Sequence, residues 1–421
     1  MGVSVENVEM VEGEPLRVLI LTADAGLGHR RAAEAIGAVL QEMWGEVCEA
    51  KIVNPLEDAR VPAFLRESQA DYDRLVREMS RLYELAYDVS DANLVSSVVD
   101  GALSMMLFEA MQDIVACHRP DVIITTYPLY QAPLGAVYQA SDHYIPLLTV
   151  VTDLAAVHRL WFHDAADLCM VPTEAVRDEA VQNGIASDRI RVVGIPVHLD
   201  LTRQDWDRET LRTELGWQQD LTTILVVGSK RVEHLLDTLR ALNHSGLSLQ
   251  LVIVSGDDED LYRALQAIEW HVTAHVYGFV ENMPAMMRAV DCVISKAGGL
   301  IVAESLACGL PMLLIDALPG QEAGNVEHVV ANGAGELAKD PLAVLETMCH
   351  WLADGGRLLA EKARNARRMG RPRAAYDVAN LALAAARSGS RVQREDRAPG
   401  RAKLLDLLRR RDMACEGAQD E

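Results

Sequence analysis

The stretch that decides the fold runs from Asp291 to Asn325 and reads DCVISKAGGLIVAESLACGLPMLLIDALPGQEAGN. A short apolar strand precedes the paired glycines Gly298 and Gly299, and a helical segment follows them at once. Backbone N–H groups at such a helix start bind anions, and the helix dipole favours negative charge there. We expect a diphosphate to approach this backbone, because neither glycine has a side chain that would block it.

Polar residues around the glycine pair complete a candidate nucleotide site. Glu304 lies near the same end of the helix and is placed to accept hydrogen bonds from ribose hydroxyls. Gln321 and Glu322 follow the next strand, Pro311–Ile315, and open α/β sheets bind ligands beyond the carboxyl ends of their strands. These features suit a nucleotide diphosphate that carries a sugar. The alternative is an ordinary βαβ unit with glycines in a tight turn.

This stretch resembles the donor site of GT-B glycosyltransferases of family 28, and in particular that of monogalactosyldiacylglycerol synthases and processive diacylglycerol glucosyltransferases. The resemblance rests on Lys296–Ser305 and on Pro319–Asn325. Ile301 stands where the family has a threonine, so one hydroxyl donor to the phosphates is lost. The donor-binding residues that the resemblance implies are Gly228, Lys230, Phe279, Val280, Lys296, Gly298, Gly299, Leu300, Glu304, Gly320, Gln321, Glu322 and Asn325.

Length, charge and cysteine use restrict the class of protein. A chain of 421 residues, half of them hydrophobic, is long enough for two domains with full cores. The net charge of −22 argues against nucleic-acid binding. The seven cysteines include no CxxC pair, which disfavours a disulfide framework or a zinc site. The acidic N-terminus lacks an apolar signal-peptide core, so we expect a cytoplasmic protein.

Apolar runs alternate with helical periodicity along most of the chain, which is typical of parallel sheets. We predict an α/β fold with two Rossmann-like, doubly wound parallel-sheet domains that face a cleft, the GT-B architecture that the resemblance implies. The predicted parts are a flexible N-terminus (1–15), an acceptor domain (16–205) with a helical insertion (60–118), a donor domain (222–387) and a basic tail (388–421).

A second candidate site follows the first strand, Leu16–Thr22. Gly26, Gly28 and His29 open a helix there, and a helix dipole should lower the pKa of the imidazole and keep it neutral. Arg31 replaces the last glycine of a GxGxxG pattern, which disfavours a dinucleotide-binding dehydrogenase. The family resemblance extends to these residues and implies an acceptor loop at Gly26 and Gly28 with His29 as the base. The alternative is a histidine that only caps the helix.

The element from Thr152 to Trp161 begins at the end of the strand Leu147–Val151 and resembles a T-D-x-x-x-x-H-x-x-W pattern of the family. Asp153 is placed to orient a base or an acceptor hydroxyl, and His158 is a rival base. We expect Trp161 to pack rather than to touch substrate. A loop Asp that caps a helix is the alternative for Asp153.

Two further elements bear on donor binding. Gly228 ends the strand Thr223–Val227, and Lys230 and Arg231 follow where relatives have a glycine-rich run. These cations either bind the phosphates by charge or begin a solvated helix. Phe279 and Val280 match a G-[WF]-V element whose backbone reads the uracil edge in the family, with Phe279 packing on the base.

The C-terminal tail differs in charge from the rest of the chain. Residues 387–411 carry nine Arg and Lys against three acidic residues, a net charge of +6, with four leucines among them. A short basic amphipathic helix of this kind lies on membrane surfaces. A solvated tail is the equal alternative.

Together these features predict an inverting glycosyltransferase that moves galactose or glucose from a UDP-sugar to a diacylglycerol-type lipid, at the inner face of the cell membrane as a peripheral protein. We expect no cofactor and no obligatory metal, because the sequence has no DxD-like motif near the donor site. The alternatives are N-acetylglucosaminyl transfer to an isoprenoid-linked precursor, a UDP-sugar 2-epimerase of the same fold, and a non-catalytic UDP-sugar-binding protein.

Overall fold

A computed structural model of the protein describes residues 14–25, 27–67, 92–141, 144–155, 157–202, 207–228, 234–317 and 322–388. Several features predicted above lie outside these residues: positions 1–13, Gly26, positions 68–91 of the helical insertion, Lys230, Arg231, Gly320, Gln321 and the basic tail from 389 onward.

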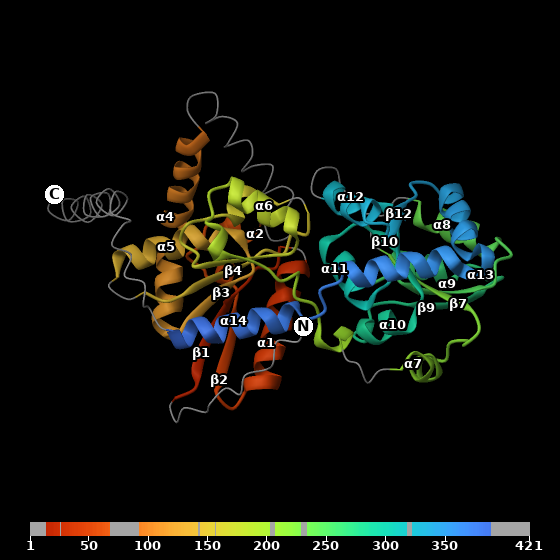
Figure 1. Ribbon diagram of the computed structural model, residues 1–421, viewed down its shortest axis with the longest axis horizontal. Helices are drawn as coiled ribbons and strands as arrows, with labels where there is room; N and C mark the ends of the chain where they lie inside the picture. Colours follow the sequence, from red (N-terminus) through yellow and green to blue (C-terminus); the bar gives the residue numbers. More distant parts are fainter. Residues whose placement is uncertain are drawn as a thin grey trace.

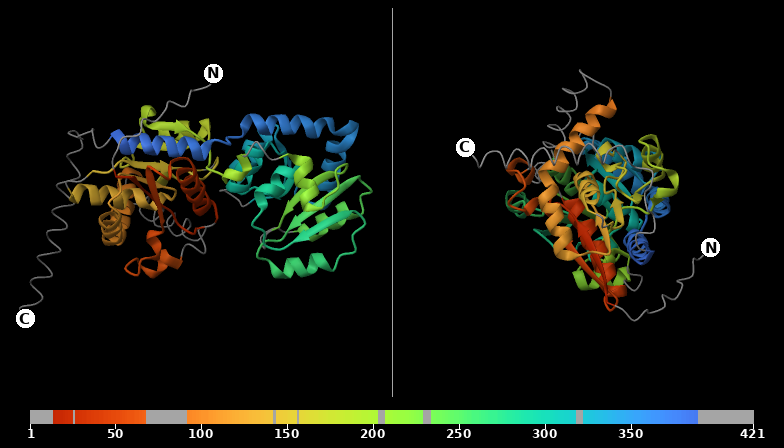
Figure 2. Two further views of the ribbon diagram at one scale, coloured as in Figure 1. Left: turned by 90° about the horizontal axis from the view of Figure 1, so that it is seen from below. Right: turned by 90° about the vertical axis from the view of Figure 1, so that its left-hand side faces the viewer.

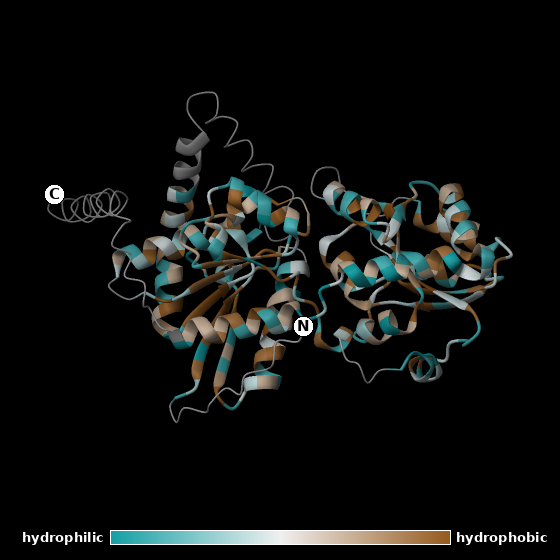
Figure 3. Ribbon diagram, in the orientation of Figure 1, coloured by the Kyte–Doolittle hydropathy of each residue, from teal (hydrophilic) through white to brown (hydrophobic). Residues whose placement is uncertain are grey.

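The first lobe is built on a six-stranded parallel sheet in the order β2-β1-β3-β4-β5-β6 (Figure 1). Its strands are β1 (Leu16–Leu21), β2 (Cys48–Val53), β3 (Val122–Thr125), β4 (Leu147–Val150), β5 (Leu168–Val171) and β6 (Ile190–Val192). Leu19 and Leu21 pack into one core, and Val18 and Ile20 pack into the other. Both faces are thus buried, which explains why the strands read as continuous apolar runs, as Figure 3 shows for this sheet.

Helices cover both faces of this sheet. They are α1 (Leu27–Trp44), α2 (Ala63–Glu67), α4 (Ala92–His118), α5 (Gln131–Ala140) and α6 (Glu174–Gln182). The core on one side contains residues of α4 and α5, and the core on the other side contains residues of α1. The predicted helical insertion therefore contributes its second half, α4, to the core of the first lobe.

The second lobe repeats the plan with a sheet in the order β12-β11-β10-β7-β8-β9. Its strands are β7 (Thr222–Val227), β8 (Leu249–Val254), β9 (Thr273–Tyr277), β10 (Cys292–Lys296), β11 (Met312–Asp316) and β12 (Gly335–Leu337). Its helices are α7 (Arg208–Leu215), α8 (Leu235–Asn243), α9 (Glu259–Gln266), α10 (Met283–Ala289), α11 (Gly299–Cys308), α12 (Ala323–Ala331) and α13 (Pro341–Met369). The strand pairs are all parallel, so the predicted pair of doubly wound sheets is confirmed.

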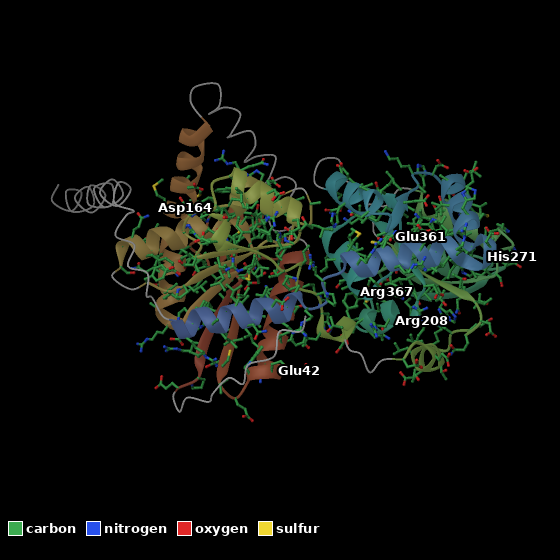
Figure 4. The ribbon with its side chains drawn as sticks, in the orientation of Figure 1. Glu42, Asp164, Arg208, His271, Glu361 and Arg367 are labelled. Atoms are coloured by element: carbon green, nitrogen blue, oxygen red, sulfur yellow. The ribbon has the colours of Figure 1, made fainter. Side chains whose placement is uncertain are left out.

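Helix α7 lies between the predicted acceptor domain (16–205) and the predicted donor domain (222–387). Arg212 is buried and donates from Nη2 to Asp291 Oδ2 at 2.7 Å. Arg208, labelled in Figure 4, donates from Nη1 to Asp291 Oδ1 at 2.6 Å. Since Asp291 directly precedes β10, these bonds fasten α7 to the second lobe.

The last helix, α14 (Ala374–Ser388), packs on the first lobe, although we predicted that residues 222–387 form one donor domain. Its residues Val378 and Ala382 share a core with Ile36 of α1 and Ile124 of β3. The left view of Figure 2 shows α13 and α14 along the same side of the molecule, one on each lobe. The physical reason is that the apolar face of α14 completes the core that α1 alone leaves uncovered.

The two passages of the chain between the lobes touch each other. Gly194 has a φ of +96°, and a Cβ there would come within 2.4 Å of Arg371 Cβ. Gly370 ends α13, and a Cβ there would come within 2.1 Å of Leu306 O. Gly194 is therefore required by its left-handed backbone and by the Arg371 side chain, and Gly370 by close approach of the backbone of α11.

The described residues contain no helix that is long and apolar enough to cross a membrane.

Candidate active site

The candidate donor end lies where β10 passes into α11. Gly298 caps this helix with ordinary extended backbone, at φ −65° and ψ 141°, and no side chain of the described residues bonds to the helix start. The N–H groups of the first turn therefore point toward solvent or ligand. Strand β10 lies beside β7, where the strand order of the second sheet reverses. This is the point at which doubly wound sheets bind ligands.

The glycine pair at this helix start is not required by the fold. A Cβ on Gly298 would meet its nearest neighbours at 3.7 Å, and one on Gly299 would meet its nearest neighbour at 3.6 Å. Both distances are ordinary van der Waals contacts, and neither residue has a positive φ. Packing therefore leaves room for a Cβ at both positions. The absence of side chains favours close approach of a ligand instead.

An ion pair adjoins Gly298. Lys296 Nζ lies 2.6 Å from Glu322 Oε1, and each of these atoms is 3.7 Å from the place of a Cβ on Gly298. Asn325 is buried, and its Nδ2 donates to Ala297 O at 2.9 Å. The buried Asn325 Oδ1 has no hydrogen-bond partner among the described residues. Residues predicted from two separate motifs thus meet around one helix start.

Glu304 and Leu300 lie on α11, both partly buried. Burial raises the pKa of the Glu304 carboxyl to about 7, while the Arg31 guanidinium of α1 acts in the opposite direction. A poorly hydrated carboxylate gains more from hydroxyl donors than one in water does. Its position one turn from Gly299 fits the predicted contact with ribose.

Of the other predicted donor residues, some have a packing role and one is exposed to solvent. A Cβ on Gly228 would come within 2.7 Å of Leu261 Cδ2 and 3.2 Å of Val254 O, so close packing favours a glycine here without any ligand. Phe279 is 61% exposed, whereas Val280 packs against the core of the second lobe. The exposed ring is therefore available to stack on a planar ligand.

The candidate acceptor end is centred on His29, which is 5% exposed in the first turns of α1. Its Nδ1 lies 2.9 Å from Thr126 O and 2.7 Å from Thr152 Oγ1. The three residues follow β1, β3 and β4, which are neighbours in the sheet. The order of the first sheet reverses between β1 and β3, so this end also occupies a switch point.

The hydrogen bonds of His29 determine which nitrogen carries the proton. The carbonyl of Thr126 accepts only, so Nδ1 is the N–H nitrogen and the lone pair is on Nε2. Burial lowers the pKa of His29 to about 4, and the Thr126 carbonyl partly opposes this. We predicted a neutral imidazole because of the helix dipole. The larger cause is burial.

Asp153 is tied to Trp161. The indole Nε1 donates to Asp153 Oδ2 at 2.7 Å, and the fully buried indole ring lies with its centroid 5.9 Å from that of His29. Burial raises the pKa of Asp153 to about 6, and the indole N–H lowers it. Trp161 therefore packs, as predicted, and also orients the carboxyl.

His158 has a structural task that His29 lacks. Its Nδ1 accepts a hydrogen bond from Leu160 N at 3.3 Å and caps the short 3-10 helix Arg159–Trp161. Burial lowers its pKa as well. This geometry favours His29 as the base, although both roles stay predictions.

The two ends meet. A Cβ on Gly299 would lie 3.6 Å from Thr152 O and 3.8 Å from Leu154 N. Leu154 packs into the core of the second lobe, and α1 contacts α11 (Figure 1). The imidazole of His29 and the start of α11 are thus separated by a single residue of the β4 loop, Thr152. The Nδ1 side of His29 and the start of α11 therefore both contact Thr152.

Known families match both lobes. The family profile described as monogalactosyldiacylglycerol (MGDG) synthase matches residues 29–197, and that of the glycosyltransferase family 28 C-terminal domain matches residues 223–379. A probable monogalactosyldiacylglycerol synthase 2 of Oryza sativa subsp. japonica is 32% identical over 371 residues, which are 86% of this chain and 79% of that protein. Monogalactosyldiacylglycerol synthase 2 of Arabidopsis thaliana is 31% identical, over 89% of this chain and 82% of that protein.

The chain belongs to the monogalactosyldiacylglycerol synthase family. It is therefore an enzyme, a UDP-sugar-dependent hexosyltransferase.

Solved structures agree on the fold of this family member. MurG of Acinetobacter baumannii has a TM-score of 0.57 at 17% identity and covers 88% of this chain and 100% of its own. A UDP-GlcNAc 2-epimerase of Neisseria meningitidis has a TM-score of 0.54 at 15% identity, over 88% and 100%. The fold is GT-B. At these identities the likeness shows the fold alone, since one fold carries several activities.

Three contributors to this family member's site were missed from the sequence. Thr126 and Thr152 hold the imidazole, and Arg31 affects Glu304 across the lobes. A signal existed for Thr152, because it directly follows the predicted strand Leu147–Val151. Among the described residues, the predicted set His29, Asp153, His158 and Gly28 lies in the first lobe. Gly228, Phe279, Val280, Lys296, Gly298, Gly299, Leu300, Glu304, Glu322 and Asn325 lie in the second.

Proposed function

We propose that this protein transfers a hexose from a UDP-sugar to the hydroxyl of a diacylglycerol-type lipid, with inversion at the anomeric carbon. The observation that carries the proposal is the meeting of a neutral buried imidazole with a helix start that has no side chains. The names of the relatives supply the substrate class, because they are monogalactosyldiacylglycerol synthases. Galactose is therefore the first sugar to test, with glucose as the alternative.

In this mechanism His29 Nε2 takes the proton of the acceptor hydroxyl while the hydroxyl oxygen attacks the anomeric carbon. The bond from that carbon to the phosphate oxygen breaks, and its electron pair leaves with UDP. The start of α11 and Lys296 stabilise the charge that develops on the diphosphate. Glu304 binds the ribose, and the ring of Phe279 stacks on uracil. General-base help of this kind contributes roughly 10²–10⁴-fold.

The decisive experiment incubates the protein with UDP-galactose or UDP-glucose and vesicles that contain diacylglycerol. Formation of a glycolipid with a β-linkage supports the proposal. An epimerised donor, or UDP-sugar binding without turnover, contradicts it. Parallel reactions with EDTA test the expectation that no metal or other cofactor is required, because metal-independent turnover survives chelation.

We further propose that the protein acts as a peripheral protein at the inner face of the cell membrane, since a diacylglycerol acceptor stays in the bilayer. The support is the net charge of +6 over residues 387–411 in a chain of net charge −22. Basic residues near an anionic surface contribute about 1 kcal/mol each. Sedimentation with anionic vesicles, reversed by high salt and reduced by truncation after Gly389, is the expected result. If the truncated protein sediments as much as the full chain, another part of the protein makes the membrane contact.

A further inference from the structure

One short segment touches both ends of the site. Thr152 Oγ1 lies 2.7 Å from His29 Nδ1, and the same residue's carbonyl oxygen lies 3.6 Å from where a Cβ on Gly299 would stand. Thr152 is 6% exposed. It follows Val151, the first residue after β4, and β4 is one of the central strands of the first sheet. Its backbone and side chain therefore have fixed positions against two different lobes.

The threonine oxygen has a defined part in the hydrogen bonding of His29. Nδ1–H donates to the Thr126 carbonyl, and Thr152 Oγ1 is the nearer second acceptor of the same N–H. With the carbonyl alone, the ring could still rock about the Cβ–Cγ bond. Two acceptors that follow different strands, with the Tyr127 ring in a T-shaped arrangement beside the imidazole, restrict this rotation and so the direction of Nε2.

We propose that Thr152 is a positioning residue, which aims His29 Nε2 at the acceptor hydroxyl and keeps the imidazole in register with the donor-binding start of α11. The proposal rests on the function proposed above, because it assigns a role within the same reaction. Its two halves come from one residue: the hydroxyl sets the ring, and the carbonyl sets the ring's distance from Gly299.

Three substitutions separate this role from a merely structural one. Thr152→Ser keeps the hydroxyl, Thr152→Ala removes it and leaves space, and Thr152→Val replaces it with a methyl group. A methyl carbon needs about 3.5 Å from a neighbouring heavy atom, so the valine displaces the imidazole from its position at 2.7 Å. Misplacement of a reacting group by about 1 Å costs roughly 10²-fold in rate.

The test measures kcat, the KM for the UDP-sugar, UDP affinity and the ¹⁵N chemical shifts of the His29 ring in each variant. We expect kcat to be close to wild type in Thr152→Ser, lower in Thr152→Ala and lowest, by roughly 10²-fold, in Thr152→Val. The KM and UDP affinity should stay within about twofold, and the His29 shifts should change in Thr152→Val but not in Thr152→Ser.

Wild-type kcat in Thr152→Val overturns the proposal, as does an equal loss in Thr152→Ser. A parallel fall in UDP affinity or in melting temperature assigns Thr152 to folding instead and also overturns it. If the wild-type protein forms no glycolipid, the proposed function fails. The ring shifts still report whether Thr152 positions His29, so the two failures are distinguishable.

Discussion

At the carboxyl ends of the strands of the first sheet, the groups around His29 are side chains and a carbonyl held by hydrogen bonds. At the carboxyl ends of the strands of the second sheet, the anchor is the backbone of Gly298 and Gly299, which no described side chain caps. The first arrangement fixes one nitrogen in direction, which proton transfer needs. The second offers several N–H groups to any anion. Changes at the first end should therefore reduce kcat, and changes at the second should reduce affinity.

The largest expected effect is at the first end. His29→Ala should lower turnover by roughly 10²-fold or more, because it removes the proposed base, while UDP affinity stays within about twofold. Initial rates of glycolipid formation and calorimetry with UDP measure the two quantities. His158→Ala is the control and should lose far less, since His158 caps a 3-10 helix. The assignment of the base is wrong if His158→Ala loses more turnover than His29→Ala.

At the second end, Gly299→Ala should weaken UDP binding by about 10-fold without loss of stability. A Cβ fits the fold there, with its nearest neighbour at 3.6 Å, but stands in the path of a phosphate. Gly309→Ala is the matched control. Its φ is +69°, and its Cβ would meet Arg367 Cγ at 2.2 Å, so the melting temperature should fall while UDP affinity remains. An unchanged UDP affinity in Gly299→Ala would show that the diphosphate does not bind at the start of α11.

A third prediction uses the titration of Glu304. Ribose hydroxyls bind the carboxylate, so UDP affinity should rise with pH until Glu304, with its pKa of about 7, is ionised. Glu304→Gln should bind UDP about 1.5 kcal/mol more weakly at pH 8 and lose most of this pH dependence. Calorimetry across pH 5.5–8.5 gives both results. The glutamine variant also controls for protonation of UDP itself.

The same substitution should stabilise the ligand-free protein. Burial raises the Glu304 pKa from 4.5 to about 7, so between these values the native state holds a proton that the unfolded chain has released. Wild-type stability therefore falls as pH rises through this window. Glu304→Gln should be more stable at pH 8, by on the order of 3 kcal/mol, and nearly equal near pH 4.5. A constant difference in melting temperature at all pH values would contradict this.

The smallest expected effect is at Gly28, on the first turn of α1. A Cβ there meets nothing within 4 Å, so the fold does not require this glycine. Gly28→Ala should raise the free energy of unfolding by about 0.5 kcal/mol, because alanine loses less backbone entropy in a helix. Thermal denaturation measures this. A rise in the KM for the lipid, with UDP affinity unchanged, is expected if the acceptor passes over this turn.

Much of the fold was predictable because the signals are local. The continuous apolar run at Leu16–Thr22 indicated a buried parallel strand, and β1 covers Leu16–Leu21. The short strand Gly335–Leu337 was missed, since three residues carry no pattern. The placement of α14 was also missed. An amphipathic helix indicates that it packs on a sheet, but not on which one.

The site residues were also predictable only where the sequence signal is local. Gly298, Gly299 and His29 stood out because each lies at a strand-to-helix junction in the sequence. The bond between His29 and Thr152 spans 123 residues and depends on the order of three strands, which no local pattern gives. The cause of the low His29 pKa was misjudged for the same reason, because burial comes from distant elements such as Tyr127 and Trp161.

The return of α14 to the first sheet makes the second lobe an insertion within the first. The chain leaves at Gly194 and comes back at Arg371, and these residues touch. A donor lobe can then be exchanged between related enzymes as a single block, provided both cuts fall at this contact. A fragment that ends at residue 205 would expose the face of α1 that α14 covers, so a first lobe made alone needs residues 374–388 rejoined to it.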